Sequence, residues 1–205
     1  MGLTIGKESI KLGAKLGGGI VVYVDASGKH GLIAADKDDP ISPWNGGAAD
    51  STYAWDSGAD WELYVNGSAV CTTHLLLVPP QTITLTKGGV ANTLTVWSAG
   101  LGNTNVINSY TSATHIFNAN AVCLNYAGGG YTDWYLPSKG ELTKLYIAHT
   151  LGIGGFVDSY YWSSTEYHDD TYPSNCAWIQ TFYSGYQTNA NKSDGSRSVR
   201  AVRSF

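Results

Sequence analysis

The sequence predicts an α+β fold in which two helices combine with short, mostly antiparallel strands. The 205 residues include 25 glycines, 14% charged residues and 12% aromatic residues. This composition is typical of a loop-rich protein with β-strands rather than a helical bundle or a disordered chain. β-Branched runs lie near both ends, and two segments between them space their apolar residues by three and four, as helices do. The length fits a single domain, residues 1–205.

The first strands are expected close to the N-terminus. Ile20 to Val24 is a β-branched run, Ala26-Ser27-Gly28 has the composition of a turn, and Gly31 to Ala35 returns as the hairpin partner. The following segment, Asp36 to Ala49, is rich in Asp, Pro and Gly and therefore predicts a loop.

Three short strands are expected over the middle of the chain. They cover Trp61 to Val65, Thr82 to Leu85 and Thr93 to Trp97, and the Pro79-Pro80 pair separates the first from the others.

A first helix is expected from Thr104 to Tyr126, ended by Gly128-Gly129-Gly130. Its apolar face would hold Ile107, Tyr110, Ala113, Phe117, Ala121 and Leu124. The second helix begins after Pro137, where Ser138 and Glu141 form a capping box. Its apolar face would hold Leu142, Leu145, Tyr146 and His149, and Gly152 would end it.

Charge and hydropathy exclude several classes of partner. The formal net charge is −4 and no run of Lys or Arg occurs, so binding to nucleic acid through its phosphates is not expected. No apolar run is long enough to span a bilayer. The segment Met1 to Lys15 lacks the apolar region of a secretory signal peptide.

Cysteine spacing indicates neither a zinc site nor a redox motif. Cys71, Cys123 and Cys176 cannot all pair within one chain. We expect buried reduced thiols, and one disulfide with one remaining thiol is the alternative.

Candidate catalytic and metal-binding residues are few. His149 is expected to be a packed core residue, and the acidic cluster Asp36, Asp38 and Asp39 is expected to be a solvated turn. Calcium requires several oxygen ligands held together, and the motifs that provide them in sugar-binding lectins are absent. We expect no catalytic residue, no metal site and no cofactor, and hence no enzyme.

The last forty-five residues alternate between two kinds of segment. The segments 167–176, 183–184 and 188–191 contain only residues that a codon ending in a pyrimidine can encode. Residues that such codons cannot encode occur only outside these segments, for example at Glu166, Trp178, Gln180, Gln187 and Lys192. This is the pattern expected if the adenines of asparagine codons were randomised and the third base kept. An ordinary polar loop also favours Ser, Asn, Asp and Thr and remains the alternative.

This tail resembles the variable region of proteins diversified by diversity-generating retroelements, which display their changing residues on a C-type-lectin fold. Two further segments, residues 17–35 and 130–146, are similar to the C-terminal domain of a collagen-like bacterial adhesin, which belongs to the same fold class. The resemblance covers about residues 17–48 and 100–205, and it implies an insertion at about 50–99 and a diversified region at about 160–205. It also implies that the first and last strands pair, with Val199 to Phe205 beside Ile20 to Val24.

The resemblance implies a ligand-binding protein on a phage or cell surface, with an unknown protein or glycan as its target. It is compatible with an oligomeric protein. The expected ligand-binding residues are Tyr167, His168, Asp169, Asp170, Thr171, Tyr172, Tyr183, Ser184, Tyr186, Thr188, Asn189 and Asn191. We expect their side chains to be exposed on one face, because a close-packed core does not tolerate random substitution. Five residues are expected to be buried beneath them: Trp134, Trp162, Phe182, Val199 and Val202. The alternatives are a fixed-sequence adhesin domain that binds acidic polysaccharide and an enzyme of the formylglycine-generating type.

Overall fold

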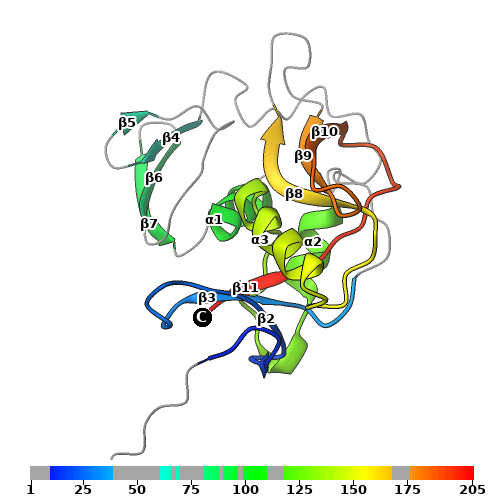
Figure 1. Cartoon of the computed structure of the whole chain (residues 1–205). Helices are drawn as coiled ribbons and strands as arrows, with labels where there is room; N and C mark the ends of the chain where they lie inside the picture. Colours follow the sequence, from blue (N-terminus) through cyan, green and yellow to red (C-terminus); the bar gives the residue numbers. More distant parts are fainter. Residues whose placement is uncertain are drawn as a thin grey trace, which may run out of the picture.

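The chain has a mixed α+β architecture. The computed structural model describes residues 10–38, 61–65, 68–69, 81–87, 90–96, 99–109, 118–167 and 176–205. These residues form three α-helices and several antiparallel sheets. Figure 1 shows the helices between the N-terminal strands and the strands of the C-terminal tail.

The N-terminal sheet has the strand order β1-β2-β3-β11. Its strands are β1 (Lys15–Leu16), β2 (Gly19–Val24), β3 (Gly31–Ala34) and β11 (Val202–Ser204). The predicted hairpin of β2 and β3 is confirmed, and its turn is closed by Asp25 Oδ1, which accepts from the Ser27 N–H at 3.1 Å.

The expected pairing of the C-terminal strand with Ile20 to Val24 is wrong. β11 pairs with β3 instead, with Val202 opposite Ala34 and Ser204 opposite Leu32. The other edge of β2 is already occupied, because the chain turns at Gly17 and Gly18 and pairs β1 with β2. The two ends of the chain therefore share one sheet without pairing with each other.

Two separate helices replace the single helix predicted over residues 104–126. They are α1 (Ala99–Ser109) and α2 (Asn118–Asn125), and the short 3-10 turn η2 (Gly128–Gly130) follows α2. α2 buries Ala119 and Cys123, whereas the predicted Ala121 and Leu124 are only half-buried. The prediction assumed one continuous helical spacing of apolar residues across both segments. Because the segments are two helices, the buried face of one does not determine the buried face of the other. Of the predicted apolar face, Ile107 is buried in α1, and Tyr110, Ala113 and Phe117 lie outside the described residues.

Helix α3 (Lys139–Thr150) begins and ends as predicted. Ser138 Oγ accepts from the Glu141 N–H at 3.2 Å, and Glu141 Oε2 accepts from the Ser138 N–H at 2.7 Å. The same carboxylate oxygen accepts from the N–H of Gly100 at 3.0 Å. One buried carboxylate thus stabilises the N-termini of α1 and α3, because the first N–H groups of a helix lack partners within it.

The C-terminal sheet has the order β10-β9-β8. Its strands are β8 (Tyr160–Tyr167), β9 (Cys176–Thr181) and β10 (Gln187–Asn191). The register of β8 and β9 shifts between Trp162 and Glu166, where the regular pairing of the two strands is interrupted. α3 packs on β8 and β9, as well as on β2 of the other sheet.

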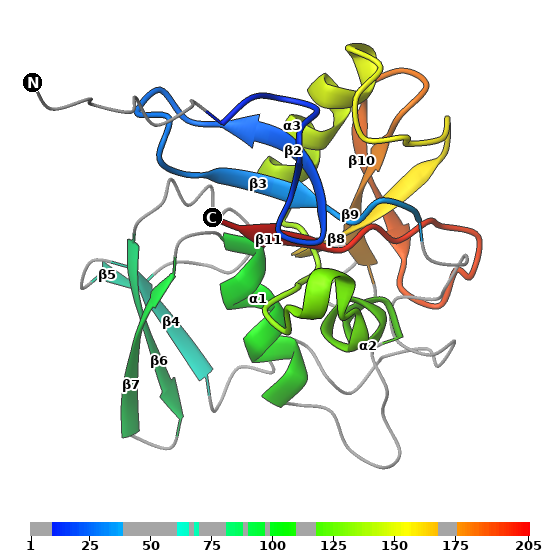
Figure 2. The same cartoon turned by 90° about the horizontal axis from the view of Figure 1, so that it is seen from below.

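The segment predicted as an insertion forms a sheet of its own, with the order β5-β4-β6-β7. Its strands are β4 (Trp61–Val65), β5 (Ser68–Ala69), β6 (Gln81–Lys87) and β7 (Val90–Val96). The three predicted strands are confirmed. Figure 2, seen from below, shows this sheet at the side of the molecule next to α1, which contacts β7.

The core consists of two clusters of buried residues, the first with side chains of α1 and α2 and the second with side chains of α3. One includes Trp134, Trp162 and Val199, and the other includes Phe182 and Val202. All five residues predicted to be buried are at most 2% exposed, which confirms that expectation. Within the described residues, no helix is long and apolar enough to cross a membrane.

Candidate ligand-binding face

The expected ligand-binding residues lie along β10, the turn that precedes it, and the end of β8. Five of the seven that are described have exposed side chains: Tyr183, Ser184, Tyr186, Thr188 and Asn191. Tyr167 and Asn189 are half-buried. His168, Asp169, Asp170, Thr171 and Tyr172 lie outside the described residues.

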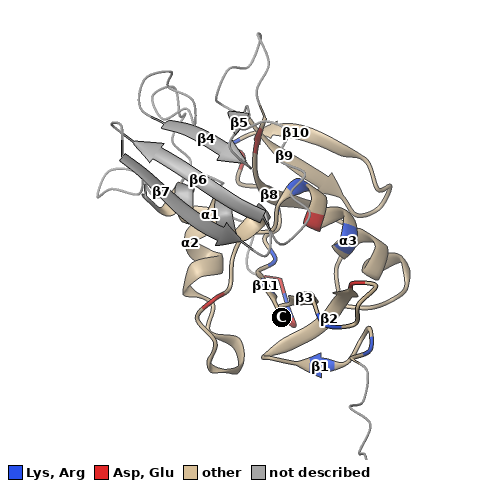
Figure 3. Cartoon of the chain, turned by 90° about the vertical axis from the view of Figure 1, so that its left-hand side faces the viewer, with Lys and Arg blue, Asp and Glu red and all other residues tan. Residues whose placement is uncertain are grey.

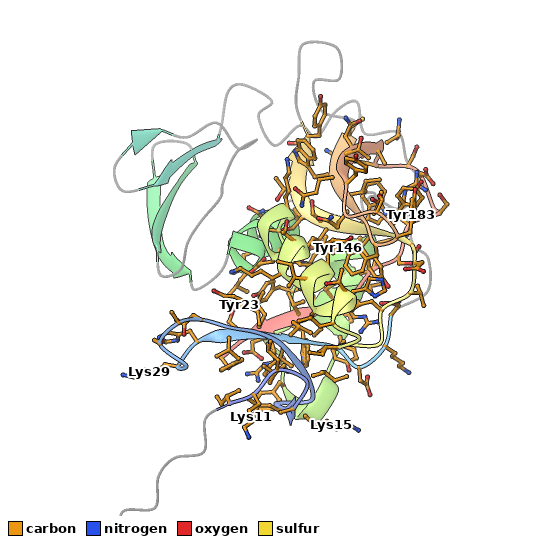
Figure 4. All side chains as sticks on the ribbon, in the orientation of Figure 1. Lys11, Lys15, Tyr23, Lys29, Tyr146 and Tyr183 are labelled. Carbon is orange, nitrogen blue, oxygen red and sulfur yellow. The ribbon has the colours of Figure 1, made fainter. Side chains whose placement is uncertain are left out.

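The turn between β9 and β10 holds two exposed tyrosines in a defined backbone conformation. Gly185 has φ +80°, and a Cβ on it would lie 2.6 Å from the ring of Tyr146. Gly185 N–H donates to the carbonyl of Thr181 at 2.8 Å. The side chains of Tyr183 and Tyr186, 56% and 76% exposed, therefore extend from a turn that only glycine can form at this point. Figure 4 shows Tyr183 at the opposite end of the molecule from Lys11, Lys15 and Lys29.

Tyr183 belongs to a small aromatic and cationic cluster. Its hydroxyl is hydrogen-bonded to that of Tyr160, and the two rings meet edge to face at 5.3 Å. The hydrogen bond raises the pKa of Tyr183 above its usual value of 10.0. The guanidinium of Arg197 lies 4.6 Å from the Tyr160 ring centre and pairs with Asp194 at 2.9 Å. Sequence reasoning assigned no role to Tyr160 or Arg197.

A second cluster lies where α3 meets the sheet. Tyr167 packs edge to face on Trp178 with ring centres 5.1 Å apart, and Asn189 lies opposite Trp178 in the register. Lys139 Nζ lies 2.9 Å from the centre of the Trp178 ring, and burial lowers the pKa of Lys139 below its usual value of 10.5. No sequence pattern indicated Lys139, since its contact with Trp178 depends on the packing of α3.

The residues do not all share one face. Thr188 lies opposite Ile179 and Asn189 lies opposite Trp178, and neighbouring residues of a strand point to opposite sides of the sheet. Thr188 is exposed because β10 is at the edge of the sheet. The expectation of a single face is therefore wrong for Thr188, because a fully diversified strand must present residues on both sides.

The residues of this region that pyrimidine-ended codons cannot encode are buried more deeply than the expected ligand-binding residues. Glu166, Gln180 and Lys192 are at most 3% exposed, and Lys192 Nζ forms an ion pair with Glu166 Oε1. Trp178 and Gln187 are half-buried. Gln187 Nε2 donates to the Lys139 carbonyl at 2.7 Å, which fastens β10 to the first turn of α3.

Two residues of the segments 167–176 and 188–191 are buried, although pyrimidine-ended codons can encode them. Cys176 is 5% exposed and Ala190 is 9% exposed. Both are small, and both lie within strands of the sheet. Cys123 is also buried, as expected, and Cys71 lies outside the described residues.

Arg200 connects the segment that follows β3 with the segment that follows α3. It is 1% exposed and pairs with Asp38, and its Nη1 donates to the carbonyls of Ala35 and Gly154, each at 2.7 Å. Tyr161 also donates to Asp38, at 2.6 Å. Burial followed by this hydrogen bond raises the pKa of Tyr161 well above its usual value.

These contacts correct the expectation for the acidic cluster. Asp38 is half-buried and is bound by Arg200 and Tyr161 rather than solvated, whereas Asp36 is exposed as expected. Asp36 accepts from the Tyr126 hydroxyl at 3.2 Å, and Asp39 lies outside the described residues. Among the residues that are described, no group of three His, Cys, Asp or Glu side chains is arranged to hold a metal ion.

His149 is packed against aromatic rings, as predicted. Its ring centre lies 5.4 Å from that of Phe182, and its Nε2 lies 3.0 Å from Asp158 Oδ1. A separate hollow of about 260 Å³ lies at the turn of β1 and β2, lined by Lys15, Leu16, Gly17, Gly18, Gly19, Ile20 and Asp36. None of the described ligand-binding candidates lines this hollow.

Comparison of the chain with the profiles of known protein families and with curated protein sequences gives no match.

Proposed function

We propose that this chain is a ligand-binding protein of the receptor or adhesin type, built on a C-type-lectin-like fold, whose C-terminal surface residues are diversified by a retroelement. One observation carries the proposal: the residues of β8 to β10 that adenine randomisation cannot produce are buried or half-buried, and the exposed residues are ones that it can produce. Glu166, Gln180 and Lys192, which adenine randomisation cannot produce, are buried. Tyr183, Ser184 and Tyr186, which it can produce, are exposed.

The chemistry of the exposed residues supports binding rather than catalysis. Tyrosine provides a large contact area that loses little conformational entropy, and Ser, Thr and Asn adapt their hydrogen bonds. The structure beneath them is suited to holding such side chains still. Gly185 packs on Tyr146, Gln187 is bonded to α3, and Trp162 is fully buried. Surface residues on such a base can change without unfolding the domain.

The proposed setting is a phage or cell surface, and the proposed target is a protein or glycan on another surface. The decisive test of diversification is the DNA around the gene. We expect a reverse transcriptase gene nearby and a near-copy of the last coding segment that differs from it at adenines. A flanking region without either would overturn the retroelement part of the proposal and leave a binding domain of fixed sequence.

A library experiment tests the structural part. The first library places pyrimidine-ended random codons at Tyr183, Ser184, Tyr186, Thr188, Asn189 and Asn191. A matched library places the same codons at six buried residues that such codons can also encode: Ser163, Ser164, Thr165, Thr181, Ser198 and Ala201. Protease resistance of the displayed variants reports folding. We expect most of the first library and few of the second to resist, and equal fractions would contradict the proposal.

A further inference from the structure

The two edges of the C-terminal sheet differ. The outer edge of β8 is closed, because the Trp162 N–H donates to the Ser198 carbonyl at 3.0 Å and the Ser198 N–H donates to the Tyr160 carbonyl at 2.8 Å. The Ser164 N–H donates to the Pro137 carbonyl at 2.8 Å on the same side. β10, at the other edge, pairs only with β9 among the described strands.

The hydrogen bonds of the hairpin show which backbone groups of β10 point outward. The Thr181 N–H donates to the Tyr186 carbonyl at 2.8 Å, so Thr181 and Tyr186 face each other across the ladder. Such pairs alternate along antiparallel strands. Thr188 and Ala190 therefore direct their backbone groups to β9, and Gln187, Asn189 and Asn191 direct theirs away from the sheet.

These outward groups form a regular row. The N–H and carbonyl of Gln187 and Asn189, and the N–H of Asn191, have no hydrogen-bond partner within the described residues. The Asn191 carbonyl accepts from the Asp194 N–H at 2.9 Å. The groups repeat every two residues, which is about 7 Å at a rise of about 3.4 Å per residue.

The strand β10 itself lacks the charge, proline and bulge that often prevent strand addition. Natural edge strands carry charged side chains, proline or bulges that block a further strand. β10 reads Gln-Thr-Asn-Ala-Asn, without charge or proline, and its pairing with β9 is regular over all five residues. Figure 3 shows β9 and β10 without any Lys, Arg, Asp or Glu. The charge of the next residue, Lys192, is buried against Glu166.

We infer that the outer edge of β10 binds an extended peptide segment of the target protein as an additional strand. The inference rests on the proposed function and assigns the ligand class of the same face. A peptide strand presents alternating N–H and carbonyl groups at the same spacing of about 7 Å, so it satisfies the whole row at once.

Strand addition also explains how the protein can keep its ability to bind peptides while its surface residues change. The backbone bonds do not depend on which residues diversification produces, so they contribute to affinity in every variant. Side chains of the added strand would lie beside Asn189 and Asn191 on one face of the sheet and beside Thr188 and Ala190 on the other. Specificity therefore comes from residues on both faces, which accounts for the opposite orientations of Thr188 and Asn189.

The probe is a displayed library of short unconstrained peptides, selected on the immobilised wild-type chain. Selected peptides are then titrated against Asn189→Pro and against the matched control Asn189→Ala. Proline at an outward-facing edge position keeps the bonds to β9 but removes the outward N–H and blocks a further strand. We expect affinity to fall about ten-fold or more in Asn189→Pro and about three-fold or less in Asn189→Ala.

A second measurement tests the same hydrogen bond if the Asn189→Pro variant does not fold. A synthetic peptide of residues 176–205 is ligated at Cys176 to residues 1–175, with the amide at Asn189 replaced by an ester. This removes the outward N–H of Asn189 and also weakens the Thr188 carbonyl as an acceptor from β9, so a matched ester at Ala190, which removes an inward N–H and weakens the outward Asn189 carbonyl, and the all-amide ligation product are the controls. We expect a loss of affinity of about five-fold. N-methylation along the selected peptide should weaken binding at every second residue.

Several outcomes would overturn the inference. Equal losses in Asn189→Pro and Asn189→Ala, with no alternation in the N-methyl series, would mean recognition by side chains alone. Recovery of no peptide would also overturn it, as would concentration-dependent dimers of the chain that Asn189→Pro abolishes. The proposed function fails separately, if replacing Tyr183 and Tyr186 with Ser leaves binding of the same peptides unchanged.

Discussion

Glu166 and Lys192 form an ion pair that is almost completely excluded from solvent, with side chains 2% and 0% exposed. They lie at the two ends of the segment that contains every expected ligand-binding residue. The pair therefore joins the start and the end of this segment inside the protein.

Removing one partner of this pair should destabilise the protein strongly. Glu166→Gln or Lys192→Met would leave an uncompensated buried charge, which costs about 3–5 kcal/mol. The double variant Glu166→Leu with Lys192→Met should recover most of that loss, since apolar replacement of a buried pair is often nearly neutral. Urea denaturation of the single and double variants measures this, and additive losses would contradict it.

Exposed tyrosines and buried framework residues should respond differently to substitution. Replacing Tyr183 and Tyr186 with Ser should change the free energy of unfolding by only about 0.5 kcal/mol per site. Trp162→Ala should cost about 3–5 kcal/mol, because it removes a fully buried indole and leaves a cavity. Thermal melts compare the two. Greater loss in the tyrosine variant would mean that the turn stabilises the fold.

The turn before β10 should depend on Gly185. Gly28 provides the matched control, since it also has positive φ, +69°, but nothing lies within 4 Å of a Cβ built there. Gly28→Ala should cost about 1–2 kcal/mol for the left-handed conformation alone. Gly185→Ala should cost more and should weaken peptide binding, because its methyl group would overlap the Tyr146 ring. Equal destabilisation of both variants would show that the Tyr146 ring moves aside at little energetic cost.

Stability should fall in acid through Asp133. The hydrogen bonds from Arg203, both 2.9 Å, hold the pKa of Asp133 below its usual value of 3.8. A carboxylate with a depressed pKa contributes stability above its unfolded-state pKa, and that contribution disappears as the pH falls through the folded-state pKa. We expect the difference in stability between wild type and Asp133→Asn to decline below about pH 4. Denaturation curves at several pH values measure it, and a pH-independent difference would contradict the assignment.

A strong chelator should change neither the melting temperature nor peptide binding. The carboxylate of Asp38 is bound by Arg200 and Tyr161 and so does not require a cation. An ion bound only to the native state would raise the melting temperature. A lower melting temperature in chelator would therefore indicate a structural metal, and lost binding at unchanged melting temperature would indicate a metal at the ligand face.

Local patterns predicted several elements because their causes are close in sequence. The capping box of α3 involves Ser138 and Glu141, three residues apart, and the β2–β3 hairpin requires only a β-branched run and a turn. The start of α1 was not predicted, because its Gly100 N–H is bound by Glu141, 41 residues later. The predicted partner of β11 was wrong for a similar reason, since β1 pairs with the edge of β2 at which β11 was expected.

The candidate site was predicted residue by residue but not in its geometry. Codon type distinguished Tyr183 and Tyr186 from Gln180 and Lys192, whose burial differs as expected. It could not show that Lys139 covers Trp178, or that Arg197 lies on Tyr160, because these contacts arise from packing between distant segments.

The closed edge of β8 limits how far strand addition can proceed. Ser198 and Pro137 occupy backbone groups of Tyr160, Trp162 and Ser164 on that side, so that within the described residues the open edge of the C-terminal sheet is β10. Once a strand has been added there, the chain itself offers no second open edge in the described part of this sheet, and further growth would have to start from the added strand. Each of many copies crowded on one surface therefore has a single edge of this sheet with which to capture a target strand.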